Sequence, residues 1–224
     1  MSTVAELIYF QPKDSVKPED PSSDEGRLLL EHFQTAKHQS GYHSSAWGRT
    51  VEDPKTIVWV VEWKDAHAGT QPQSLARFLE PNTHVAVIFC TLSPPISKTD
   101  TLTQNPVTEL CALAFPSSLT PDDHRALCND LINFRNALTE QLPAESRPTS
   151  WAMGQVERPG ALQHEKSLTG QAIVHLLTVG WKSVEAHMAI KQSKEFTEAI
   201  QPIRERMLPP LQGLGMKHVS FQKV

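Results

Sequence analysis

Two histidines lie where a predicted strand runs into a predicted helix, and both are candidates for proton transfer. His187 belongs to a helix that Ser183 is placed to cap, and its imidazole can hold or move a proton near neutral pH. His175 has the same strand parity as Leu177 and Trp181, so it shares a face with large apolar side chains. Each histidine also has a structural alternative, His187 as a partly exposed helix residue and His175 as a satisfied core residue. We take His187 and His175 as the candidate catalytic residues.

Aromatic side chains accompany the predicted strands and suggest what kind of ligand a pocket would take. All five tryptophans lie in or beside a predicted strand, namely Trp47, Trp59, Trp63, Trp151 and Trp181. Flat aromatic walls suit a planar aromatic ligand, although any single strand tryptophan can equally serve the core. The side chains predicted to bind substrate are Trp181, Trp151, Leu177, Met153 and Phe134.

Several other chemistries lack their sequence signatures. No His/Asp/Glu set has metal-ligand spacing, no glycine-rich phosphate loop occurs, and no serine lies in a nucleophile elbow. We therefore expect no metal and no cofactor. A haem would need an axial ligand, for which His175 or His187 could serve.

Charge and cysteine content limit the partners and the compartment. A net charge of -4 without a basic cluster argues against nucleic acid and against an anionic membrane surface. Three cysteines without Cys-x-x-Cys spacing favour reduced thiols and a cytoplasmic protein. The expected partner is a small molecule, with a homodimer as a further possibility.

The elements that must position these side chains begin with a β-α-β-β-α-β order in the first half. A capping-box pattern, Ser22 with Glu25, predicts the start of the first helix, and a short helical piece ends at Phe78. The four predicted strands cover 4–11, 42–51, 57–63 and 84–92.

The same order returns in the second half with longer helices. Thr120, followed by a proline and two acidic residues, predicts one helix start, and Ser193 predicts another. Only a few positions separate Phe78 from His84 in the first half, too few for a matching second helix. A working pocket is therefore expected in the second half, between its sheet and the helices after Thr120 and Ser193. The matched points are Glu6 with Glu109, Trp63 with Trp181, and His84 with His218.

Packing rules then favour one assembly. A β-α-β-β-α-β unit forms an antiparallel sheet with both helices on one face. The strands from Ile57 and Ile173 are apolar at both parities, so each sheet must also be covered on its other face. We therefore predict an α+β protein with a first half over 1–98, a linker over 99–106 and a second half over 107–224. The two sheets would face each other inside one chain, with helices outside.

One stretch carries a resemblance to a known family. Residues Gly180–His187, followed by Ser193 and Phe196, resemble the strand–helix junction of the dimeric α+β barrel superfamily, above all its antibiotic-biosynthesis-monooxygenase-like branch. The resemblance covers nearly the whole chain in two copies, which implies a tandem fused duplication of ferredoxin-like halves. In the first copy Gly69 falls where His187 stands in the second.

The resemblance implies a range of activities. Proteins that look like this include cofactor-free monooxygenases, polyketide cyclases, decarboxylases, haem enzymes and proteins without known activity. It favours a cofactor-independent enzyme of secondary metabolism that oxygenates a small aromatic or polyketide-like substrate through an enolate or phenolate. A polyketide cyclase, decarboxylase or dehydratase would use the same pocket, and a non-catalytic ligand-binding or scaffold protein is the alternative from another class.

Overall fold

One curled antiparallel sheet organises the chain in the computed structural model, which describes residues 3–65, 67–99 and 102–224. Its strands are β1 (Val4–Phe10), β2 (Tyr42–Arg49), β3 (Ile57–Trp63), β4 (Ala86–Cys90), β5 (Val107–Pro116), β6 (Ser150–Arg158), β7 (Leu162–Gln163), β8 (Gln171–Trp181), β9 (Lys217–Val219) and β10 (Gln222–Lys223). They follow the order β10-β2-β3-β1-β4-β6-β8-β5-β9, with β7 paired to β8. Within this order, strands β1 to β4 are arranged as β2-β3-β1-β4. Strands β5, β6, β8 and β9 are arranged in the matching order, β6-β8-β5-β9, with the second, third, first and fourth strands side by side.

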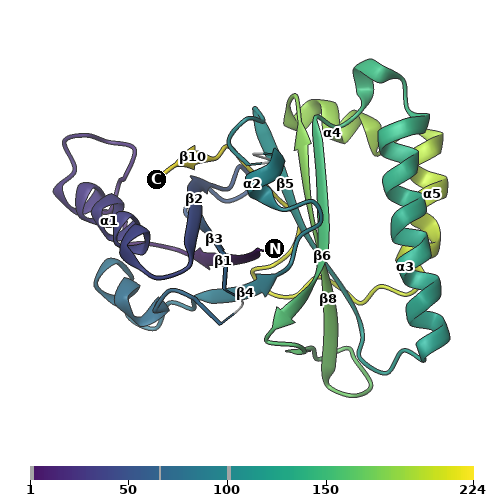
Figure 1. Ribbon diagram of the computed structural model, residues 1–224, viewed down its shortest axis with the longest axis horizontal. Helices are drawn as coiled ribbons and strands as arrows, with labels where there is room; N and C mark the ends of the chain where they lie inside the picture. The colour runs from purple at the N-terminus through teal and green to yellow at the C-terminus, as the bar shows by residue number, and fades with distance from the viewer. Residues whose placement is uncertain (1–2, 66, 100–101) are drawn as a thin grey trace.

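Helices cover the outer faces of this sheet. The α-helices are α1 (Asp24–Thr35), α2 (Ile96–Thr99), α3 (Pro121–Asn136), α4 (Val184–Ile190) and α5 (Lys194–Arg204). A π-turn (Ala137–Gln141) extends α3, and the 3₁₀ turns are Ala36–His38, Pro72–Phe78 and Ala144–Ser146. Figure 1 shows α1 outside the β1–β4 part of the sheet and α3 with α5 outside the β6–β8 part. The sheet therefore lies between two helical layers.

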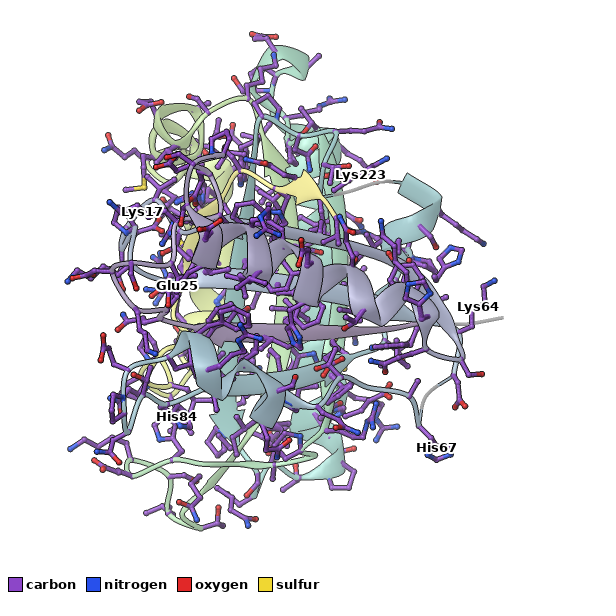
Figure 2. The ribbon with its side chains drawn as sticks, turned by 90° about the vertical axis from the view of Figure 1, so that its left-hand side faces the viewer. Lys17, Glu25, Lys64, His67, His84 and Lys223 are labelled. Atoms are coloured by element: carbon purple, nitrogen blue, oxygen red, sulfur yellow. The ribbon has the colours of Figure 1, made fainter. Side chains whose placement is uncertain are left out.

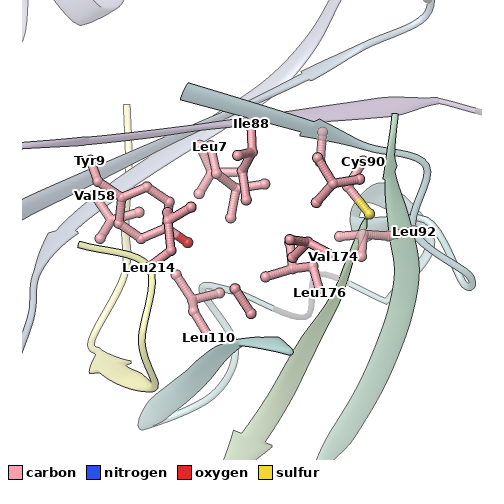
Figure 3. Packing of buried hydrophobic residues seen from close by; sticks show 14 of the residues in the cluster. Leu7, Tyr9, Val58, Ile88, Cys90, Leu92, Leu110, Val174, Leu176 and Leu214 are labelled. Carbon is pink, nitrogen blue, oxygen red and sulfur yellow. The ribbon is translucent and has the colours of Figure 1, made fainter. Parts of the chain in front are cut away.

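The strands are buried on both faces, as their apolar pattern predicts. Every residue of β3 is buried, and so is every residue of β8 from Val174 to Trp181. Because side chains alternate across a strand, Val174 and Leu176 point into the interior of the curled sheet while Leu177 and Val179 point to α3 and α5. Figure 3 shows the interior cluster, to which strands from both parts of the sheet contribute.

The two ends of the curled sheet meet through the C-terminal segment. Thr50, just after β2, bridges to Val219 of β9, and the N–H of Val51 donates to the carbonyl of His218 at 2.8 Å. Strand β10 then pairs with β2. Gly48 allows this approach, because a Cβ there would lie 2.5 Å from the carbonyl oxygen of Ser220. We call this contact, 50–52 against 218–219, the seam.

One local feature differs from the sequence prediction. The first helix is capped by Ser23, whose Oγ accepts from the N–H of Gly26 at 3.0 Å, and not by Ser22. The stretch around the predicted linker, of which residues 100 and 101 lie outside the described residues, carries buried side chains on both sides. Ile96 of α2 and Leu102 pack into the interior cluster, because their burial removes apolar surface from water.

The helical segments that follow β3 and β8 differ in length. After β3 the first half has only the 3₁₀ turn Pro72–Phe78, whereas α5 follows β8 in the second half. No helix in the described part of the chain combines the length and the apolar character that crossing a bilayer requires.

Candidate functional site

A cavity of about 190 Å³ lies between strands β5, β6 and β8 and helices α3, α4 and α5. Its walls are largely apolar, built from Leu113, Phe134, Leu138, Trp151, Leu177 and Phe196. Typical ligand pockets measure about 300–1,000 Å³, so this cavity suits a small molecule. Its lining includes the exposed residues Arg204 and Pro210, which place its mouth at the surface.

His187 is held rigidly at the wall of this cavity. The Oγ of Ser183 accepts from the N–H of Ala186 at 3.1 Å and so starts α4 directly after β8. One turn into the helix, His187 is 1% exposed and stacks on the indole of Trp181, with ring centroids 4.7 Å apart. Burial lowers the pKa of His187 to about 3, and repulsion from the protonated form of His218 and from the charge of Lys191 adds to the effect. The imidazole is therefore neutral at physiological pH and able to accept a proton.

Glu109 faces this imidazole from β5. Its Oε2 lies 3.5 Å from Nε2 of His187 and accepts a hydrogen bond of 3.0 Å from Nε1 of Trp181. Burial raises the pKa of Glu109, opposed in part by the Trp181 hydrogen bond and by the charges of His218 and Lys191. A carboxyl group with a raised pKa and an imidazole with a lowered one thus share the cavity wall. Such a pair suits general acid–base catalysis.

A second histidine and a second carboxylate continue this contact toward the surface. His218 Nε2 lies 2.8 Å from Nδ1 of His187, and His218 Nδ1 lies 2.5 Å from Oε1 of Glu52. The backbone N–H of His218 also donates to Oε2 of Glu52 at 2.9 Å. Burial alone would raise the pKa of Glu52, but the two hydrogen bonds from His218, the backbone N–H of Glu52 and attraction to His218 together leave that pKa lowered. Glu52 is therefore ionised at neutral pH, and its side chain is 33% exposed.

Further polar groups on the cavity wall suit an anionic oxygen. Lys191 and Arg204 are both in the lining, and the Arg204 guanidinium lies 5.9 Å from the centroid of the Phe196 ring. The Nε1 of Trp151, another lining residue, is buried without a hydrogen-bond partner among the described residues. A buried donor without a partner is costly, so a ligand oxygen that accepts from it would be bound favourably.

The residues predicted from the sequence fall into two groups. His187, Trp151, Leu177 and Phe134 line the cavity, whereas Trp181 lies behind His187, Met153 packs beside the same apolar cluster, and His175 is not in the lining.

The strand parity of His175 predicts the face of the sheet on which it lies, but it does not predict its position along the strand. It faces the helices as expected, but near the start of α3, with its ring centroid 5.8 Å from Phe115 and 6.1 Å from His124. Each residue advances a strand by about 3.3 Å, so the separation of His175 from the Trp181 end of β8 carries it away from the cavity. Its Nε2 is buried without a partner among the described residues, and burial lowers its pKa to about 4.

The matching place in the first half is filled. Glu6 accepts from Nε1 of Trp63 at 2.9 Å, as Glu109 does from Trp181, but also from the N–H and the hydroxyl of Thr70, both at 2.8 Å. Gly69 stands where a histidine would be expected, and a Cβ there would lie 3.0 Å from the ring of Phe89. The carboxylate is thus saturated by Thr70, and the ring of Phe89 occupies the space.

The polar groups Glu109, His218, Glu52, Lys191 and Arg204 were not among the site residues predicted from the sequence. A signal for Glu109 exists, because a glutamate recurs inside an apolar strand at Glu6 and Glu109, and buried carboxylates are rare without a partner. His218 recurs with His84, yet His84 is exposed on the surface (Figure 2), so the repetition does not mark it. Glu52 lies in an ordinary turn sequence.

A haem does not fit this arrangement. The cavity, at about 190 Å³, is small for a cofactor site, and Nδ1 of His187 is already bonded to His218. Within the described ranges, no group of three or more His, Cys, Asp or Glu residues could hold a metal ion.

Comparison with solved structures finds similar chains over nearly the full length. A provisionally named monooxygenase from Lactobacillus acidophilus NCFM has 9% identity and a TM-score of 0.54, covering 99% of this chain and 94% of its own. An anthrone oxidase-like protein has 15% identity and a TM-score of 0.51, covering 100% and 92%. A provisionally named chlorite dismutase has 6% identity and a TM-score of 0.57, covering 99% and 95%.

The likeness is one of fold. The curled antiparallel sheet with outer helices is consistent with an α+β barrel. No protein-family model and no curated protein matches the sequence.

Proposed function

We propose that this protein is a cofactor-independent monooxygenase that acts on a small aromatic or polyketide-like substrate through an enolate or phenolate. The observation that carries the proposal is the neutral Nε2 of His187, set 3.5 Å from the buried Glu109 on the wall of an apolar cavity. The names of two structural neighbours, a monooxygenase and an anthrone oxidase-like protein, agree with this reaction class.

The proposed reaction begins with proton removal. The apolar walls hold the substrate ring, and His187 Nε2 takes a proton from an acidic C–H or O–H. The electron pair stays on the substrate as an enolate or phenolate, whose oxygen is stabilised by Lys191, Arg204 and the free N–H of Trp151.

The electron-rich substrate then reacts with O₂. A new C–O bond forms, and the resulting peroxide anion takes a proton back to become a hydroperoxide. Loss of a second proton from the same carbon breaks the O–O bond, leaving a carbonyl and hydroxide, which is protonated to water. The substrate carbon supplies all the electrons that reduce O₂, so the reaction needs no external reductant.

The proposal includes the origin of the chain. The repeated strand order, β2-β3-β1-β4 and β6-β8-β5-β9, supports two ferredoxin-like halves over 1–98 and 107–224 that arose by duplication. The Glu–Trp pairs Glu6–Trp63 and Glu109–Trp181 support the same reading. The second half keeps the cavity, and the first half has filled its own.

Oxygen uptake tests the proposed function. We would supply 2-tetralone and anthrone as enolisable bicyclic and tricyclic probes and follow oxygen consumption and incorporation of oxygen-18 into the product. The expected result is uptake that depends on the enzyme, with one labelled oxygen atom in the product. Conversion without uptake would instead indicate a cyclase- or dehydratase-type reaction, and binding without conversion would indicate a ligand-binding protein.

A further inference from the structure

We propose that Glu52, His218 and His187 form a proton relay that connects the cavity to solvent across the seam. The proposal rests on the proposed function in one respect only, that His187 removes a proton from the substrate. It assigns a catalytic contribution to two residues outside the cavity, and one of them, Glu52, comes from the other half of the chain.

The contacts form an unbroken chain of ring nitrogens and carboxylate oxygens. Glu52 Oε1 is 2.5 Å from Nδ1 of His218, and His218 Nε2 is 2.8 Å from Nδ1 of His187. The remaining nitrogen, Nε2 of His187, faces Glu109 on the cavity wall. His218 and His187 are each 1% exposed, whereas the Glu52 side chain is 33% exposed. This chain of hydrogen bonds therefore has one end buried at the cavity and the other end exposed to solvent.

The chemistry of the groups fixes the proton on each ring. An ionised Glu52 can only accept, so Nδ1 of His218 carries a proton, and when this ring is neutral its Nε2 is the acceptor. Nδ1 of His187 must then donate to that acceptor, which leaves Nε2 of His187 unprotonated and directed at the cavity wall. The hydrogen-bond chain thus prepares His187 as a base at the one nitrogen that can meet a substrate.

Proton transfer along this chain is balanced at every step. When Nε2 of His187 gains the substrate proton, Nδ1 loses its own to Nε2 of His218, and Nδ1 of His218 loses its proton to Glu52. Each N–H bond that breaks is matched by one that forms, both rings end neutral, and the exposed carboxylate of Glu52 becomes a neutral carboxylic acid. The same steps in reverse return a proton to the peroxide or hydroxide.

The relay avoids leaving a positive charge on the buried ring of His187. An imidazolium confined to His187 would be a buried cation, which burial and the nearby Lys191 both disfavour. The charged groups that act on the two rings are Glu52 and Glu185 near His218 and Glu109 and Lys191 near His187. Of these, Glu52 is hydrogen-bonded to a ring nitrogen at the exposed end of the chain, at 2.5 Å, whereas Glu109 lies 3.5 Å from the ring nitrogen at the buried end. Passing the proton on to Glu52 removes the charge from the cavity.

A purely structural role for Glu52 would predict a different outcome. Its carboxylate accepts from both the backbone and the ring of His218, so Glu52→Gln keeps a similar shape and one acceptor while removing the charge and the proton-accepting capacity. A structural contact would be weakened only slightly by this change. A relay would be interrupted.

The test measures proton transfer without oxygen. Under anaerobic conditions in D₂O, the wild type should exchange the acidic methylene hydrogens of 2-tetralone faster than buffer does. Glu52→Gln should slow this exchange roughly 10- to 100-fold with an unchanged melting temperature, and added formate should restore part of the rate. Glu198→Gln, an exposed carboxylate on α5 remote from the chain, is the matched control and should exchange like the wild type.

Nitrogen NMR of the histidine rings provides a second test, which needs no substrate. We expect Nδ1 of both His218 and His187 to be protonated in the wild type, and the tautomer of His218 to change in Glu52→Gln. Unchanged tautomers, or exchange in Glu52→Gln at the wild-type rate, would overturn the relay. If the wild type itself fails to exchange the probe, the proposed function loses support, while the ring tautomers still decide whether the hydrogen-bond chain exists.

Discussion

Trp181 and His187 stack with their ring planes 6° from parallel, and the same indole donates its N–H to Glu109. One side chain at the end of β8 therefore positions both members of the acid–base pair. The stacking fixes the plane of the imidazole, and the hydrogen bond fixes the carboxyl oxygen that faces it. The strand–helix junction and the site are in this sense one unit.

The two buried glutamates offer a matched pair of substitutions. Glu109→Gln keeps an oxygen that can accept from Trp181 but removes a group able to exchange a proton with His187. We expect turnover to fall by roughly 10²-fold or more, in the range of lost acid–base groups. Glu6→Gln makes the same change beside Trp63 in the filled half and should leave turnover close to that of the wild type. Equal losses in both variants would contradict the assignment of the site to the second half.

Denaturation experiments should show that Trp181 contributes more than Trp151 to the free energy of unfolding. Trp181 is 1% exposed and packed on both sides, so Trp181→Ala should lower the free energy of unfolding by about 3–5 kcal/mol. Trp151 is 8% exposed and borders the existing cavity, so Trp151→Ala adds space where the packing is already incomplete and should cost less. Urea unfolding of the two variants checks the order. Indistinguishable midpoints would show that this burial ranking is wrong.

His175 should make the fold sensitive to acid. Its pKa is lowered from 6.5 to about 4 by burial, with the charge of His124 adding to the effect, so the unfolded chain binds a proton that the folded chain does not. Below pH 6.5 the free energy of unfolding therefore falls, by about 2 kcal/mol near pH 5 for this one group. Glu109, whose pKa is raised, contributes with the opposite sign, and its stabilisation is lost as pH rises.

The variant His175→Leu isolates that contribution. It removes a buried nitrogen that has no partner among the described residues, so stability at neutral pH should hardly change while the acid-induced loss becomes smaller. Turnover of the same variant tests the second catalytic histidine proposed from the sequence. Because His175 is not in the cavity lining, we expect turnover close to that of the wild type. An unchanged pH dependence of the melting temperature would contradict the first expectation.

Much of the fold follows from local patterns. The strands from Ile57 and Ile173 are apolar at both parities, which predicted the burial on two faces that β3 and β8 show. The cap of the first helix was one residue off, because Ser22 and Ser23 are adjacent and both precede acidic residues. Local patterns fix the existence of a helix more firmly than its first residue.

The site could be predicted only in part, for a physical reason. His187 and its cap lie within one strand–helix junction, where spacing alone brings them together. Glu52 and His218 are 166 positions apart and meet only because the C-terminal segment joins β2 at the seam. No periodicity or propensity encodes a contact that the closure of the whole sheet creates.

Oxygen uptake by His187→Gln tests the central claim most directly. Glutamine can still hydrogen-bond to His218 and Glu109, but it cannot take up a proton at neutral pH. With 2-tetralone or anthrone as the probe, we predict that uptake falls about 10²- to 10⁴-fold. His67→Ala, at an exposed position on the rim of the first half (Figure 2), should keep the wild-type rate. Full activity in His187→Gln, or loss of activity in His67→Ala, would contradict the account.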